Sequence, residues 1–161
     1  YQAARRLQII AGTGSNNTVE SISLTDHALK AGADAALLIT PYYNRPTQSG
    51  LIKHYTAVAE KCPIPLIIYD CPGRTAVNTT ADTIVELSAI PSIVGVKEAS
   101  GNMDQICEII TRTREALTGL SGDDAMTLPM ISGGAMGGIG FGANRGPKRM
   151  SGRVRLAPAG H

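Results

Sequence analysis

The 161-residue sequence predicts an α/β fold with a parallel sheet, and three observations lead to it. Short apolar runs rich in β-branched residues alternate with longer amphipathic stretches, which is the pattern of repeated βα units. The runs contain few polar residues, as strands buried on both faces of a parallel sheet do. Such alternation builds either an open doubly wound sheet or a (β/α)8 barrel. We count six βα units, about three quarters of a barrel, so the barrel would be incomplete.

Each element has its own local signal. The first strand is expected at residues 7–11, and a helix follows from a cap at Asn16, Asn17 or Thr18 to a stop at Gly32. The later strands are expected at 35–40, 65–69, 93–97 and 117–121, with a weak last strand from about 136 through Ile139. The later helices are expected at about 47–61, 80–89 and 104–115, then a short one before Gly133 and a last one from Lys148. Residues 41–46, 70–75 and 122–124 are expected to be loops.

The composition excludes several classes of protein. With 43% hydrophobic and 17% charged residues, the chain is neither disordered nor a disulfide scaffold. No apolar run approaches the roughly 20 residues of a membrane span, so we expect no membrane partner. The first residues lack a Met and the apolar run of a signal peptide, and we therefore expect a central fragment of a cytoplasmic protein. The three cysteines, Cys62, Cys71 and Cys107, lack C-x-x-C spacing and fit a reducing compartment.

The charge is unevenly distributed along the chain. Residues 1–124 hold all 13 acidic residues and 10 of the 15 basic ones, whereas the remainder holds five basic residues and no acid. A basic segment at 145–161 can grip a polyanion electrostatically. It contains no aromatic residue for stacking on bases, so we favour a solvated helix face or tail and expect no nucleic-acid partner.

Lys97 is the residue with the clearest chemical potential. It ends the run Ile93–Lys97, and strict alternation along a strand would place it on one buried face with Ile93 and Gly95. Burial of a lysine lowers its pKa and turns the amine into a nucleophile that forms a Schiff base with a carbonyl. The alternative is a lysine that reaches water at the strand end or pairs with Glu98.

Three more residues follow the expected strands. Tyr69 ends the preceding strand, where a phenol can relay protons beside an imine, or simply close the core. Arg74 stands in a Pro-Gly turn, where it can clamp a carboxylate with two hydrogen bonds or be a solvated loop residue. Tyr43, beside Tyr42 in a proline-rich loop, suits an interface, the rim of a site or surface packing. Barrels carry their active sites at these strand ends, so the residues together indicate an active site more strongly than any one of them does.

Two other signals are rejected. Gly138–Ala143 matches the dinucleotide fingerprint G-x-G-x-x-G/A, but no acidic residue lies about 20 positions later and no tight strand precedes it. His27 and His54 lie within expected helices without partners at metal-ligand spacing, so no metal site is expected.

Five segments of the sequence resemble one known family. They are Ile10-Ala-Gly-Thr-Gly-Ser15, Thr40-Pro-Tyr-Tyr-Asn-Arg-Pro46, Tyr69-x-x-Pro-Gly-Arg-Thr75, Val94-Gly-Val-Lys-Glu-Ala-Ser-Gly101 and Leu120-Ser-Gly-Asp-Asp124. In order and spacing they resemble the dihydrodipicolinate synthase family, from about residue 8 to 139. The wider superfamily of pyruvate-dependent class I aldolases, including N-acetylneuraminate lyase, shares the tyrosine and the lysine. The loop at 40–46 and Arg74 favour the synthase.

The resemblance implies a role for each matching residue. Lys97 matches the lysine that forms an imine with pyruvate, and Tyr69 matches the tyrosine that passes protons to and from it. Arg74 matches the arginine that receives the carboxylate of aspartate semialdehyde. Tyr43 matches a tyrosine that reaches across a dimer interface, and Ile139 matches a backbone position beside bound pyruvate. The family uses no metal or organic cofactor, and it forms homo-oligomers, dimers or tetramers.

The sequence also departs from the family. We find no match to the family's first two βα units, with their Gly-Thr-Thr-Gly-Glu loop, or to its helical C-terminal extension. Asp70 stands where the family usually has Asn, and from Gly138 onward a glycine-rich stretch replaces a Val-Ile-Ser-Val-Thr-like strand. We therefore expect an incomplete (β/α)8 TIM barrel as a single domain over residues 1–161, with a poorly matching basic segment at 145–161.

The expected function is that of a Schiff-base lyase that condenses pyruvate with L-aspartate 4-semialdehyde on the route to lysine. Two alternatives stay open. One is another pyruvate aldolase of the superfamily, similar to N-acetylneuraminate lyase. The other is a non-catalytic fragment whose basic tail binds polyanions.

Overall fold

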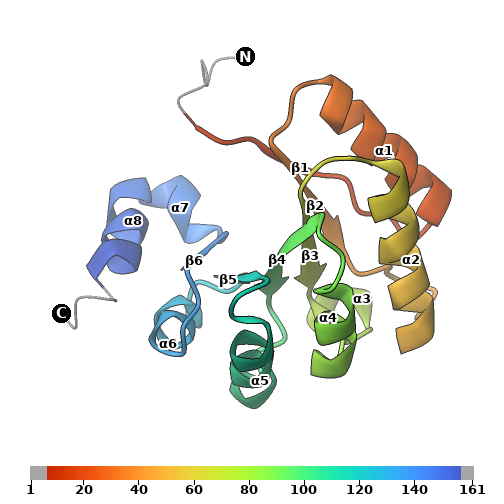
Figure 1. Ribbon diagram of the computed structural model, residues 1–161. Helices are drawn as coiled ribbons and strands as arrows, with labels where there is room; N and C mark the ends of the chain where they lie inside the picture. Colours follow the sequence, from red (N-terminus) through yellow and green to blue (C-terminus); the bar gives the residue numbers. More distant parts are fainter. Residues whose placement is uncertain (1–6, 157–161) are drawn as a thin grey trace.

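Six parallel strands form one curled sheet in the computed structural model, which describes residues 7–156 (Figure 1). Neighbours in the sheet follow the order of the chain, β1-β2-β3-β4-β5-β6, and every pair is parallel. The strands are β1 (Ile10–Gly12), β2 (Ala35–Ile39), β3 (Leu66–Asp70), β4 (Ile93–Glu98), β5 (Thr118–Ser121) and β6 (Gly137–Gly138). The prediction of an incomplete barrel of six βα units is confirmed.

The helices follow one another along the outer side of this arc (Figure 1). They are α1 (Thr18–Lys30), α2 (Gln48–Lys61), α3 (Pro72–Thr75), α4 (Ala81–Leu87), α5 (Met103–Thr113), α6 (Thr127–Ser132), α7 (Gly142–Arg145) and α8 (Pro147–Leu156). Asn17, Thr47, Thr80 and Asn102 cap the first turns of α1, α2, α4 and α5, because each side chain accepts a hydrogen bond from a backbone N–H there. Within the described residues, no helix is long and apolar enough to cross a membrane.

The main core lies between the sheet and the helices. Leu38, Leu66, Ile68 and Val96 point outward from the strands into one cluster, where Tyr55 of α2 is fully buried. A smaller cluster joins α5 to α6 through Ile106, Ile110, Met130 and Ala135. Because these residues hold the helices against one face, the opposite, concave face of the strands is the one left for a site.

A bulge in β4 changes the alternation that the sequence suggested. Leu66 pairs with Ile93 but Ile67 pairs with Gly95, so Val94 is an extra residue that has no partner in β3 and is 37% exposed. Ile93 therefore packs in the main core together with Val96. The prediction that Ile93 shares a face with Lys97 is wrong, whereas Gly95 still lies one pleat before Lys97 on that face.

Three further differences concern the ends of elements. The first strand begins at Ile10, later than residue 7, and the expected loop at 70–75 contains the helical turn α3. The weak last strand is only Gly137–Gly138, and Ile139 lies just beyond it. Three glycines in this stretch explain the short strand, since glycine offers no side chain to pack and loses much entropy on ordering. The last helix, expected from Lys148, is confirmed and begins at Pro147.

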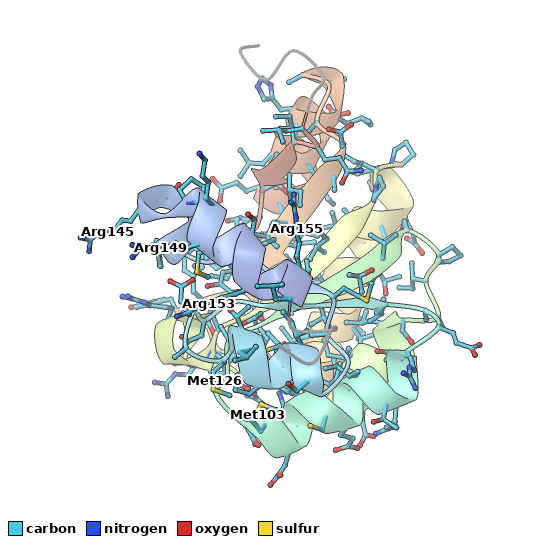
Figure 2. All side chains as sticks on the ribbon, turned by 90° about the vertical axis from the view of Figure 1, so that its left-hand side faces the viewer. Met103, Met126, Arg145, Arg149, Arg153 and Arg155 are labelled. Atoms are coloured by element: carbon cyan, nitrogen blue, oxygen red, sulfur yellow. The ribbon has the colours of Figure 1, made fainter. Side chains whose placement is uncertain are left out.

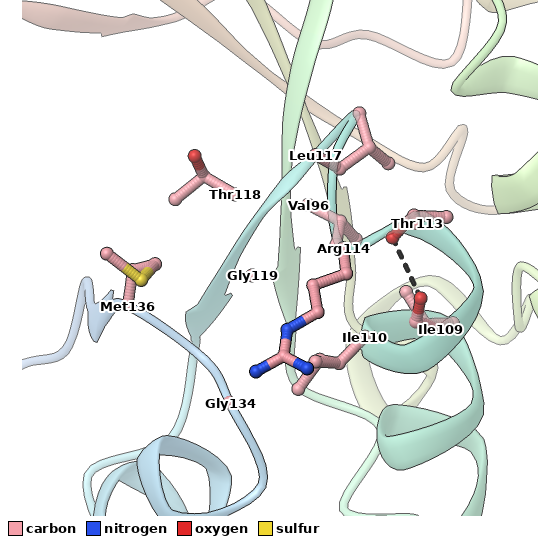
Figure 3. A pocket seen from close by; sticks show the side chains of 10 residues that line it. All are labelled: Val96, Ile109, Ile110, Thr113, Arg114, Leu117, Thr118, Gly119, Gly134 and Met136. Carbon is pink, nitrogen blue, oxygen red and sulfur yellow. Dashed lines mark hydrogen bonds between the residues drawn. The ribbon is translucent and has the colours of Figure 1, made fainter. Parts of the chain in front are cut away.

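A cavity of about 330 Å³ lies between α5 and the start of β5 (Figure 3). Its walls include Ile109, Ile110, Leu117 and Gly119, and the Arg114 side chain extends along one side. None of the residues singled out in the sequence lines it. This cavity is thus a gap between a helix and the sheet, separate from the strand ends.

Candidate functional site

Lys97 and Tyr69 lie side by side at the carboxyl ends of β4 and β3. They are partners in the parallel ladder, and Lys97 Nζ lies 3.7 Å from the centroid of the Tyr69 ring. The lysine is only 8% exposed, and the aromatic face holds its ammonium group by a cation–π contact. Since Val96 faces the helices, Lys97 and Tyr69 face the concave side of the sheet.

Glu98 is not the partner of Lys97. Its carboxylate accepts hydrogen bonds from Ser100 N at 2.6 Å and Gln105 Nε2 at 3.3 Å, on the helix side of the strand. No carboxylate between residues 7 and 156 forms a salt bridge with Lys97. The alternative of a Lys97–Glu98 pair is therefore wrong, and the lysine amine stands against an aromatic ring with no counter-ion from the described residues.

Burial acts on both side chains of this pair. It lowers the pKa of Lys97, while the charge of Cys71 acts in the opposite sense. Burial also raises the pKa of Tyr69 to about 12, with a further rise from a hydrogen bond to Cys71 and a smaller opposing effect of Arg74. The site thus holds an amine that loses its proton more readily and a phenol that keeps its own.

Cys71 and Gly122 complete the immediate surroundings, and the sequence analysis gave neither a role. The Cys71 thiol is 9% exposed and influences both Tyr69 and Lys97. A Cβ at Gly122 would lie 3.1 Å from Lys97 Cε and 2.8 Å from Ala99 Cβ, so only glycine leaves room for the lysine there. Each follows a strand end within two positions, which is the signal that could have identified them.

Arg74 lies near the pair but faces solvent. It belongs to the turn α3 directly after β3, and its side chain is exposed. Two features set this turn. Pro72 occupies its first position, and the Cys71 carbonyl accepts hydrogen bonds from Arg74 N at 2.9 Å and Thr75 N at 3.0 Å. An exposed guanidinium on a short ordered turn is available to a carboxylate that approaches the strand ends.

Tyr43 does not join the pair within this chain. It is 89% exposed in the loop after β2, with a left-handed backbone (φ 73°). Arg45 is also left-handed (φ 46°), and Asn44 Nδ2 donates to Asn16 O at 3.0 Å, so two strained positions and a side-chain contact shape the loop. The loop leaves the tyrosine ring exposed to solvent.

Ile139 lies at the same end of the sheet as Lys97, but two strands away. Lys97 pairs with Leu120 of β5, and Ile139 N donates to Ser121 O at 2.8 Å. The Ile139 backbone is therefore hydrogen-bonded to β5, and β5 is the neighbour of β4, the strand that carries Lys97.

A pair of acidic residues lies on the opposite face of the same two strands, next to Tyr69 and Lys97. Asp70 and Glu98 are register partners, one residue beyond Tyr69 and Lys97, and are 0% and 2% exposed. Asp70 Oδ1 accepts from Thr79 N at 3.0 Å and from Thr40 Oγ1 at 3.3 Å, whereas Oδ2 has no hydrogen-bond partner in the described part of the chain. Burial and the charge of Glu98 raise the pKa of Asp70 to about 7.

The basic segment stands apart from these groups. Helices α7 and α8 contain no buried residue, and the side chains of Arg145, Arg149 and Arg153 extend outward from them (Figure 2). The expectation of a solvated helix face fits residues 145–156, while 157–161 lie outside the described part of the chain.

Comparisons with known proteins agree on one family. The model of the dihydrodipicolinate synthetase family matches residues 2–161. A 4-hydroxy-tetrahydrodipicolinate synthase of Neisseria meningitidis serogroup C is 52% identical over 157 residues, which are 98% of this chain and 54% of that protein. The chain thus spans about half the length of the curated relatives it matches.

Solved structures lead to the same family. The dihydrodipicolinate synthase of Aquifex aeolicus superposes with a TM-score of 0.96 at 46% identity, over 99% of this chain and 55% of that one. The enzyme of Acinetobacter baumannii, solved in complex with pyruvate, gives a TM-score of 0.95 at 48% identity, over 98% and 54%. The curled sheet described above is therefore shared with complete proteins of this kind.

Proposed function

We propose a Schiff-base aldol condensation as the function, from the premise that this chain belongs to the dihydrodipicolinate synthetase family. The substrates would be pyruvate and L-aspartate 4-semialdehyde, and the product 4-hydroxy-tetrahydrodipicolinate, a precursor of diaminopimelate and lysine. The observation that carries the proposal is the buried Lys97 amine, 3.7 Å from the centroid of the Tyr69 ring and without a carboxylate partner among the described residues.

The first steps follow from the state of these two groups. The neutral Lys97 amine attacks C2 of pyruvate, and loss of water gives the imine. The protonated imine nitrogen withdraws electrons, so a proton leaves C3 and an enamine forms. Tyr69, which keeps its proton over the working pH range, donates to the departing oxygen and returns protons between steps.

The second half of the reaction uses Arg74. In this proposal the exposed guanidinium receives the carboxylate of aspartate semialdehyde, and the enamine C3 attacks its aldehyde carbon. The amino group of the bound semialdehyde then adds to C2, and Lys97 leaves as a free amine when the ring closes. The covalent bond between Lys97 and the substrate is thereby broken, the free amine is restored, and no cofactor is consumed.

Tyr43 enters the proposal through a second subunit. An 89% exposed aromatic residue on a strained loop is suited to an interface, which supports this placement. We place the tyrosine in the relay of a neighbouring copy, and Ile139 beside pyruvate through its backbone. We place the reaction in the cytoplasm, since all three cysteines are free thiols.

The test is reductive trapping of the imine. The chain is incubated with pyruvate and sodium borohydride, and peptide mass mapping locates the reduced adduct. We expect one adduct, on Lys97, and its loss in Lys97→Arg, which keeps the charge but forms no imine with pyruvate under these conditions. In Tyr69→Phe the ring contact remains, and we expect trapping to slow by about a hundredfold or more, as for the loss of a general acid.

Two results would count against the proposal. An adduct distributed over exposed lysines, or none on a folded chain, would mean that the strand ends lack a reactive amine. An adduct on Lys97 without turnover of semialdehyde would favour another pyruvate aldolase of the superfamily, and turnover that Arg74→Ala leaves unchanged would contradict the role of Arg74.

A further inference from the structure

The glycine-rich stretch after β6 closes around a carboxylate. Asp124 Oδ2 accepts a hydrogen bond from Gly142 N at 2.7 Å, 18 residues away in the sequence. Its Oδ1 is buried without a hydrogen-bond partner among residues 7–156 and lies directly against Gly140, where a Cβ would overlap it. A Cβ at Gly142 would also come within 3.1 Å of Oδ2. The carboxylate thus fills the space that side chains at 140 and 142 would need.

This arrangement explains a motif that the proposed reaction does not use. The segment Gly138–Ala143, which resembles a dinucleotide fingerprint, has a glycine at fingerprint position 140 and another at 142. The Asp124 carboxylate fills the space that a Cβ at either glycine would need. The two glycines therefore leave room for the Asp124 carboxylate of the same chain.

The carboxylate connects two segments at the carboxyl end of the sheet. Asp124 follows β5 and Gly122, whose Cα lies beside the Lys97 side chain, while Gly140–Gly142 follow Ile139. Ile139 is held on one side by its hydrogen bond to Ser121 O. Directly after Ile139 comes the segment Gly140–Gly142, which contacts the Asp124 carboxylate. With a two-residue strand before it, that segment has little other support.

We propose that Asp124 is a positioning residue: its carboxylate fixes the turn at Gly140–Gly142 and thereby sets the Ile139 backbone beside the candidate site. It acts through the backbone, without contact to substrate. The inference rests on the proposed function for its effect on pyruvate, but the clamp itself is measurable without any reaction.

The first test measures the clamp alone. Hydrogen exchange of the intact chain reports on the Gly142 amide, and we expect its protection to fall about tenfold or more in Asp124→Ala, as for the loss of one charge-assisted hydrogen bond. Asp124→Asn keeps an acceptor oxygen and should retain most of the protection. Asp123→Asn is the matched control, because it removes a neighbouring exposed carboxylate that does not contact Gly142.

A double-mutant cycle tests the fit of Gly140. The Gly140→Ala change should lower the midpoint of urea unfolding strongly in the natural background, because the new Cβ meets Asp124 Oδ1. The same change should cost little in Asp124→Ala, where the space is free. Equal costs in both backgrounds, or unchanged exchange at Gly142 in Asp124→Ala, would overturn the clamp.

Pyruvate trapping separates positioning from a merely structural contact. We expect Asp124→Ala to raise the half-saturating pyruvate concentration for trapping on Lys97 about tenfold, with a smaller change in the rate at saturation, and Asp124→Asn to restore it. Altered exchange with unchanged saturation would overturn the positioning role. If the natural chain forms no imine at all, the proposed function fails, and the exchange and cycle results still decide the clamp.

Discussion

At the scale of single residues, Lys97 combines a reactive position with a cost to stability. Its amine is buried against Tyr69 without a counter-ion among the described residues, and this burial lowers the pKa of Lys97 relative to the unfolded chain. The unfolded chain binds the proton of Lys97 more firmly than the folded chain does. Near neutral pH, burial of the charged amine therefore lowers the free energy of unfolding. Residues that a reaction requires often reduce stability in this way.

We therefore predict that Lys97→Met abolishes pyruvate trapping and stabilises the fold. Methionine keeps the length of the side chain and its contact with the Tyr69 ring but removes the amine. The free energy of unfolding should rise by about 1 kcal/mol at pH 7, a gain typical of relieving an active-site group. Because the pKa of Lys97 is lowered in the fold, the gain should shrink as the pH rises toward 10. Urea unfolding at several pH values is the measurement, and a less stable variant at pH 7 would contradict it.

The sequence identified Lys97 and Tyr69 because both end apolar runs, and the ends of neighbouring parallel strands must meet. It did not identify Cys71 or Asp124, because their contacts depend on how the segments after β3 and β6 turn. Those turns are set by single hydrogen bonds, such as the one from Gly142 N to Asp124 Oδ2, which leave no periodic signal. Exposure of Tyr43 likewise follows from left-handed backbone angles that the sequence does not reveal.

At the scale of elements, the ends of β3 and β4 hold two different pairs on their two faces. Tyr69 and Lys97 face the concave side, while Asp70 and Glu98 face the helices. Around Asp70 stand Thr40 just after β2, Tyr55 of α2 and Glu98, and none of them carries a positive charge. The pair is stable only if one carboxyl keeps its proton.

This pair predicts a pH-dependent stability. The pKa of Asp70 is about 7 in the fold, above the value near 4 that an unfolded chain shows, so the folded state binds more protons between these limits. Stability should therefore fall as the pH rises from about 4 to about 7, by roughly 2 to 4 kcal/mol. In Asp70→Asn, which does not titrate, most of this decline should vanish. Chemical unfolding at pH 4.5, 6 and 8 measures it.

The control for this prediction is Asp104→Asn, on the exposed first turn of α5. It should show the same pH dependence as the natural chain. A decline of equal size in Asp70→Asn would mean that Asp70 is ionised throughout and that the pair shares no proton.

The alternation of elements was predictable because strand and helix periods differ, whereas α3 and α7 were missed because four-residue turns carry no period. The bulge was missed for a related reason. Ile93-Val-Gly-Val-Lys97 has the pattern of one continuous strand, and only its pairing with β3 reveals that Val94 is extra.

At the scale of the whole molecule, the sheet has two edges. In the described part of the chain β1 and β6 each pair on one side only, and both are short. Large apolar side chains stand exposed toward both ends of the arc, among them Ile10 at 40%, Met136 at 72% and Phe141 at 84%. Unpaired edges beside apolar surface invite association.

We predict that the 161-residue chain on its own is marginally stable or associates with itself. Sedimentation velocity should show species that grow with concentration, and thermal unfolding should depend on concentration as well. A sharp, concentration-independent transition of a monomer with strong amide protection throughout the sheet would contradict this prediction.

The bulge at Val94 also bears on how relatives are aligned. The extra residue lets one strand present Ile93 to the helices and Lys97 to the concave face, although four positions separate them. A relative without the bulge needs one residue fewer between the end of α4 and the lysine. Gaps in this region therefore belong at position 94, and deletion of Val94 should leave a regular ladder that keeps Ile93 in the core and Lys97 on the concave face.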